Sequence, residues 1–66
     1  MKDINIWIEV PGGKELLASY KADSFYKAVL LYIDDHPSSE HELQFFKKED
    51  GSNGYSISGS ELFESN

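Results

Sequence analysis

The sequence predicts a small α+β domain over residues 1–66, in which two β-hairpins flank one α-helix and the helix packs on one face of a mainly antiparallel sheet. Three observations support this ββαββ arrangement. Apolar and polar residues alternate in several short segments, as they do in strands with one buried face. Glycine-containing pairs typical of turns separate these segments. Between the hairpins, a stretch without glycine or proline carries apolar residues at helical spacing.

The first predicted hairpin covers residues 4–21. Isoleucine or valine occupies positions 4, 6, 8 and 10, and Trp7 lies among the residues between them, which predicts a strand with one buried face. A Pro-Gly-Gly turn at residues 11–13 leads into a second strand, from residue 15 to residue 21. In that strand we expect Leu16, Ala18 and Tyr20 to point inward, and Leu17 to point outward.

The predicted helix begins after Asp23 or Ser24, either of which can accept a hydrogen bond from the first helical turn. It continues to about Asp35 and ends before Pro37, because the residue that precedes a proline avoids helical geometry. Leu31 is an apolar residue on an otherwise polar side of the helix. The apolar side, which we expect to lie on the sheet, carries Phe25, Tyr26, Val29, Tyr32 and Ile33.

The second predicted hairpin pairs a strand at residues 42–48 with a strand at residues 55–58, across two turn dipeptides, Asp-Gly and Asn-Gly. We expect Phe45 to point inward and Phe46 outward. Residues 59–66 form either a short helical turn or a frayed end. The predicted core consists of Ile4, Ile6, Ile8, Phe25, Val29, Ile33, Phe45 and Ile57.

The charge of the chain lies unevenly along the sequence. Twelve carboxylates against six lysines give a net charge of -6, and the excess falls in residues 34–66. The chain has no arginine to grip phosphates, so we expect no direct binding to nucleic acid. The absence of cysteine favours a cytoplasmic protein. No apolar stretch approaches the roughly 20 residues of a membrane helix, so we expect no membrane partner.

Two acidic segments around His36 and His41 contain the residue types that divalent metals accept. Pro37 breaks the helix between the two histidines, so we expect a solvated acidic loop, although the sequence leaves a metal site open. Catalytic motifs are lacking, and a chain this short has little room to enclose a pocket. We therefore expect a protein that is not an enzyme and uses no cofactor.

One face of the predicted sheet has no second layer to cover it. It should display an aromatic surface made of Trp7, Leu17 and Phe46, and large exposed apolar side chains often mark a partner site. We expect an acidic rim made of Asp34, Asp35, Glu40 and Glu42 to meet a basic partner.

These features predict a small acidic, non-catalytic protein-binding module whose partner is a larger, basic protein. In size, charge and lack of cysteine the chain resembles the single-domain inhibitors made by bacteriophages and mobile elements, which include nucleic-acid mimics. That resemblance implies an inhibitor that acts on a host protein. The alternative is a self-associating structural or accessory domain, a homodimer that buries the open sheet face.

Overall fold

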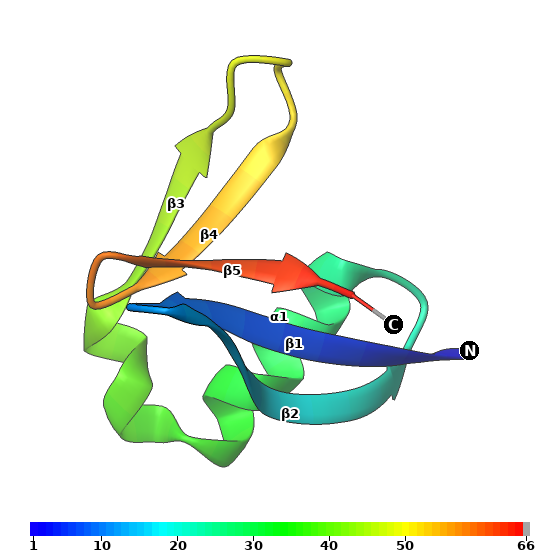
Figure 1. The fold of residues 1–66 in the computed structure, drawn as a ribbon. Coiled ribbons are helices and arrows are strands. Elements are labelled where there is room, and N and C mark those ends of the chain that lie inside the picture. The colour runs from blue at the N-terminus through cyan, green and yellow to red at the C-terminus, as the bar shows by residue number, and fades with distance from the viewer. Residues whose placement is uncertain (66) are drawn as a thin grey trace.

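A five-stranded antiparallel sheet with one α-helix on one of its faces makes up residues 1–65, the part of the chain that the computed structural model describes (Figure 1). The strand order across the sheet is β2-β1-β5-β4-β3. The elements in chain order are β1 (Lys2–Val10), β2 (Gly13–Ala22), α1 (Phe25–Asp35), the 3-10 helix η1 (Pro37–Glu42), β3 (Leu43–Lys47), β4 (Asn53–Ile57) and β5 (Ser60–Glu64).

The fifth strand is the main departure from the predicted fold, which had four. The chain turns tightly at Ser58 and Gly59, both with positive φ, as a two-residue hairpin turn requires. The C-terminal segment then pairs with β4 on one side and with β1 on the other, so it is neither a helical turn nor a frayed end. Leu62 on this strand is buried. β5 therefore joins the two predicted hairpins into one sheet.

The first hairpin forms as predicted, but it contains a β-bulge. β1 and β2 pair regularly as far as Ile6 and Ala18, after which Trp7 lies opposite Leu16. Leu17 is the extra residue of the bulged strand. The prediction that Leu16 points inward and Leu17 outward is therefore wrong: Leu16 shares the face of Trp7, while Leu17 packs against the core.

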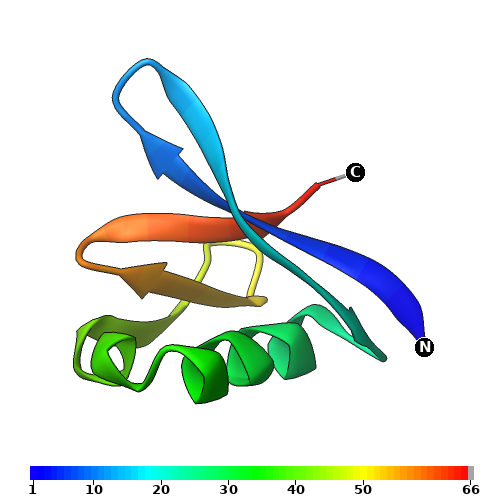
Figure 2. The same ribbon diagram turned by 90° about the horizontal axis from the view of Figure 1, so that it is seen from below.

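Helix α1 begins and ends as the sequence predicts. The Ser24 hydroxyl caps it by accepting a hydrogen bond from the Lys27 amide, and the helix ends at Asp35, two residues before Pro37. The helix packs on β2 and β1, and Figure 2 shows α1 and η1 in one layer below the sheet. With eleven residues, the one α-helix of residues 1–65 is too short to span a membrane.

The core lies between α1 and the sheet. Ile4, Ile6, Val29 and Ile57 are buried as predicted. The structure adds Leu62 and Tyr55 to them, whereas the predicted core residues Ile8, Phe25 and Ile33 are only partly buried and pack against its edge. The prediction that Phe45 belongs to the core is wrong, because 59% of this residue is exposed. Its side chain touches Tyr55, but β3 is the edge strand of the sheet, and α1 packs mainly on β2 and β1.

The acidic end of α1 is tied to the sheet by a hydrogen bond from the Tyr20 hydroxyl to the Asp35 carboxylate, at 2.8 Å. Burial, and then this hydrogen bond, raise the pKa of Tyr20 from 10.0 to about 12. The folded chain thus holds this proton more tightly than the unfolded chain does. The contribution to stability is complete below pH 10 and is lost as the pH rises towards 12.

We therefore expect the melting temperature of the Tyr20→Phe variant to fall less steeply between about pH 10 and 12 than that of the original chain. Thermal unfolding followed by circular dichroism at several alkaline pH values measures this difference. Parallel falls in the two proteins would show that the Tyr20 proton does not contribute to the stability of the fold.

Candidate functional site

The sheet face opposite α1 carries a row of three large apolar side chains on three adjacent strands. Trp7 on β1 lies opposite Leu16 on β2 and opposite Phe63 on β5. Trp7 and Phe63 are half-buried, and Leu16 is 47% exposed. No helix packs on this side of the sheet within residues 1–65 (Figure 2). We call Leu16, Trp7 and Phe63 the aromatic row.

The ring of Trp7 is held in one orientation. Its indole Nε1 donates a hydrogen bond to the Ser65 carbonyl oxygen at 3.1 Å. The ammonium group of Lys14 lies 4.6 Å from the centre of the Trp7 ring and 5.9 Å from that of Phe63, which is cation–π geometry. The aromatic row is therefore a fixed apolar strip with one positive charge above it.

Phe46, the third member of the predicted aromatic surface, lies on the same face as Trp7 but at the far edge of the sheet. Its ring packs over Gly54 on β4, where a Cβ atom would collide with it. An ion pair between Lys48 and Glu61, at 3.3 Å, lies on the same face between β3 and β5. Trp7 and Phe46 thus belong to two separate apolar patches on this face.

Of the predicted surface residues, Trp7 and Phe46 do lie on this face, whereas Leu17 does not. The prediction missed Phe63. A strand over Ser60–Glu64 places Phe63 on the face opposite the buried Leu62, but the segment has no alternation of apolar and polar residues that distinguishes a strand from a helical turn. Because of the bulge, Leu16 lies on the face where Leu17 was predicted.

The four residues of the predicted acidic rim do not border the aromatic row. Asp34 and Asp35 lie at the end of α1, and Glu40 and Glu42 lie in η1, in the layer on the other side of the sheet (Figure 2). Asp35 accepts the hydrogen bond from Tyr20, so it has a structural role. A partner seated on the aromatic row would therefore not contact these acids directly.

The two histidines lie beside these acids. The His36 ring stacks on Tyr32, with ring centres 4.4 Å apart, and its Nδ1 lies 3.1 Å from the Tyr32 carbonyl oxygen at the end of α1. Within the described part of the chain, no three side chains of histidine, aspartate or glutamate gather closely enough to hold a metal ion. His36 therefore packs against the last turn of α1 and has a structural role there.

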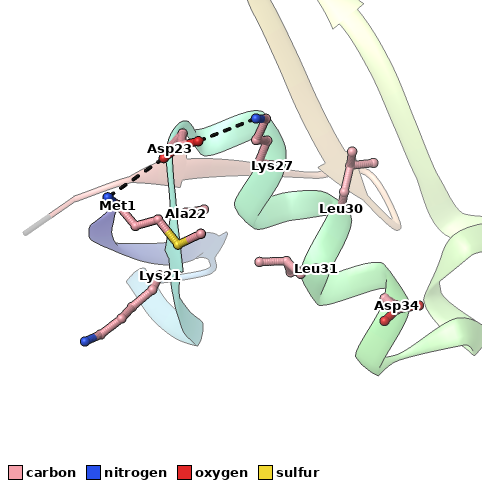
Figure 3. A pocket seen from close by; sticks show the side chains of 8 residues that line it. All are labelled: Met1, Lys21, Ala22, Asp23, Lys27, Leu30, Leu31 and Asp34. Carbon is pink, nitrogen blue, oxygen red and sulfur yellow. Dashed lines mark ion pairs between the residues drawn. The ribbon is translucent and has the colours of Figure 1, made fainter.

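A surface hollow of about 350 Å³ lies between α1 and the end of β2 (Figure 3). Its apolar lining includes Met1, Leu30 and Leu31, which accounts for the apolar residue on the polar side of the helix. At its rim Asp23 pairs with Lys27 at 3.6 Å and with the N-terminal ammonium group at 3.9 Å. The hollow is open to solvent, and its rim charges are partly neutralised by one another.

Comparison with protein-family models, with curated proteins and with solved structures gave no match for this chain.

The position of Phe63 directly opposite Trp7 on the neighbouring strand gives a direct check on the aromatic row. Trp7 is the only tryptophan, so its fluorescence reports on this surface alone. The Phe63→Ala variant should expose the indole to water, shift its emission to longer wavelength and increase its quenching by acrylamide. The Phe46→Ala variant, at the far edge of the same face, should leave both signals unchanged. Equal spectra for all three proteins would mean that Phe63 does not shield Trp7.

Proposed function

We propose that this chain is a non-catalytic protein-binding module that contacts its partner through the aromatic row. The observation that supports the proposal most strongly is the fixed, uncovered tryptophan between two other apolar side chains. Tryptophan is enriched among the residues that dominate binding energy at protein interfaces. A rigid ring also loses little conformational entropy when a partner covers it.

The net charge of -6 suggests what kind of partner the module takes. Because the acids of α1 and η1 lie away from the aromatic row, their contribution would be long-range attraction rather than contact. Long-range attraction raises the association rate of oppositely charged proteins. The proposed partner is therefore a larger, basic protein, and an inhibitor that occupies a basic surface of a host protein fits this description.

A binding experiment with two matched leucine variants tests the proposal. Leu16 and Leu31 are exposed to similar extents, 47% and 41%, but Leu16 belongs to the aromatic row and Leu31 lies on α1. We would immobilise the original chain, Leu16→Glu and Leu31→Glu, and identify by mass spectrometry the proteins that each retains from a lysate of candidate host cells.

A basic protein retained by the original chain and by Leu31→Glu, but lost by Leu16→Glu, is the expected result. Retention of the same proteins by both variants, or no retention above the empty resin, would contradict the proposal. Both substitutions lie at exposed positions, so we expect both variants to fold. Circular dichroism of each variant checks this.

The role of the acids is tested with that captured protein. We expect Asp34→Asn, Glu40→Gln and Glu42→Gln together to slow association at low salt, with little change in the dissociation rate. Asp35 is left unchanged, because it bonds Tyr20. The difference should shrink at physiological salt, where charges are screened beyond about 8 Å. Surface plasmon resonance at two salt concentrations measures both rates, and an unchanged association rate at low salt would assign these acids to solubility alone.

A further inference from the structure

The two edges of the sheet differ in how well they are protected against pairing with another strand. β2 forms one edge, and it carries the bulge at Leu17 together with Lys14 and Lys21. Bulges and lysines are the features that natural proteins use to block edge pairing. β3 forms the other edge with the sequence Leu-Gln-Phe-Phe-Lys, a regular register and no proline. Its one lysine, Lys47, donates a hydrogen bond to the Asn53 side chain on the paired strand β4, at 2.8 Å. It is thus the less protected edge.

The hydrogen bonds at the two ends of β3 show which of its backbone groups face outward. The Ser58 amide donates to the Glu42 carbonyl, and the Lys48 amide donates to the Ser52 carbonyl, so even-numbered residues bond β4. In an antiparallel ladder the groups of alternate residues point away from the paired strand. The backbone N–H and C=O groups of Phe45 and Lys47 therefore point to the free edge.

Leu43 adds one further backbone group, its carbonyl, to the free edge of β3. Its N–H bonds the carbonyls at the end of η1, which leaves its C=O available at the edge. Among residues 1–65, no backbone hydrogen bond is made to the outward groups of Phe45 and Lys47. β3 therefore presents a short row of free donors and acceptors centred on Phe45.

Large side chains accompany these free groups on both faces of the same strand. Phe45 is 59% exposed on the helix side, and Phe46 is 39% exposed on the open side. A segment rich in aromatic residues, with low charge and an unpaired backbone edge, is a strong template for strand pairing. Both phenylalanines would lose water contact if another strand were added here.

We propose that β3 is a self-association site, at which two copies of this chain pair their β3 strands antiparallel about a twofold axis through Phe45. In this register each Phe45 exchanges two backbone hydrogen bonds with Phe45 of the second copy. Each Lys47 amide then donates to the Leu43 carbonyl of the other copy. Four backbone hydrogen bonds form, and the two Phe45 rings become a cross-strand aromatic pair.

Charge supports a second copy as the occupant of this edge. Acids precede the strand, at Glu40 and Glu42, and Lys47 and Lys48 stand at its other end, ahead of two further acids in the turn, Glu49 and Asp50. Antiparallel pairing about Phe45 places Glu42 of each copy beside Lys48 of the other. A parallel arrangement would instead bring like charges together, which is unfavourable. The edge is therefore complementary to itself in hydrogen bonding, and Glu42 of each copy adds a second acidic partner for Lys48, which already pairs with Glu61 of its own copy.

The proposal does not depend on the proposed function, because the aromatic row lies on β2, β1 and β5. A twofold axis normal to the sheet would extend it to ten strands, five from each copy, with both helices on one side. Both aromatic rows would then face the same way. Loss of dimerisation and loss of partner binding are separate results, since different residues carry them.

Sedimentation equilibrium over low micromolar to near-millimolar concentrations tests the proposal. We expect a monomer–dimer equilibrium whose dissociation constant rises at least about tenfold in Phe45→Glu. Tyr26→Glu is the matched control: Tyr26 is 48% exposed and, like Phe45, packs on Tyr55, but it lies on α1 rather than at the edge. Its dissociation constant should stay within about twofold of the original.

A second measurement tests the register and does not require any loss of binding. The chain has no cysteine, so Phe45→Cys introduces a single thiol at the proposed twofold axis, where opposite Cα atoms would lie about 5.5 Å apart. Under mild oxidation this variant should form a disulfide-linked dimer at least about tenfold faster than Tyr26→Cys or Phe46→Cys.

A monomer at every concentration, together with equal cross-linking rates for the three cysteine variants, would overturn the proposal. A dimer that persists in Phe45→Glu and is lost in Leu16→Glu would also overturn it, by placing self-association on the aromatic row. Faster cross-linking of Phe45→Cys with a weakened dimer in Phe45→Glu supports it.

Discussion

A chain that ends at residue 59 is expected not to fold, because it lacks β5. This strand is bonded to β1 on one side and to β4 on the other, and it connects the β2–β1 pair to the β4–β3 pair. Its removal would split the sheet and uncover the core around Ile57, Tyr55 and Ile6. A small domain has only about 5–15 kcal/mol of stability to lose.

Circular dichroism during thermal unfolding measures this effect. We expect no cooperative transition in the truncated chain, and partial recovery of the sheet signal when a peptide of residues 58–66 is added in excess. A cooperative transition within a few degrees of that of the full chain would contradict the central place of β5 in the fold.

The second large effect is expected at Leu62, which is only 1% exposed between β1 and β4. Leu62→Ala removes buried methyl groups and leaves a cavity, which should lower the free energy of unfolding by about 2–5 kcal/mol. Leu16→Ala is the matched control, because it makes the same chemical change at a position that is 47% exposed.

Urea unfolding followed by circular dichroism gives both free energies. The Leu16→Ala variant should lose less than about 1 kcal/mol, since surface changes away from the core are usually small. Similar losses at Leu16 and Leu62 would mean that the two sides of the sheet had been assigned incorrectly.

The hairpin at residues 4–21 and the helix could be predicted because their signals are local. Alternating apolar residues, a Pro-Gly-Gly turn and a Ser24 cap each act within a few residues of chain. The bulge could not be predicted, because positions 16 and 17 are both leucine and either can face the core. The pattern is then the same for both registers, and pairing with β1 decides between them.

The exposure of Phe45 depends on strand order, which the local pattern does not contain. The prediction correctly placed Phe45 on the helix side of the sheet, but β3 proved to be the edge strand, away from β1 and β2, on which α1 mainly packs. Phe63 was missed for a related reason, since a five-residue segment after a Ser-Gly turn fits a short strand or a helical turn equally well. Of the three residues of the aromatic row, the sequence pattern predicted Trp7 and the face of the sheet on which it lies.

Nuclear magnetic resonance tests whether the aromatic row contacts a partner. The chain has a single indole N–H, that of Trp7, so one resonance reports on the centre of the row. We would add the captured basic protein to the isotope-labelled chain and follow that signal with the backbone amides. The proposed contact predicts the largest changes at the Trp7 indole and at the amides of Leu16 and Phe63. An unchanged indole resonance, with the largest changes in α1 and η1, would contradict it.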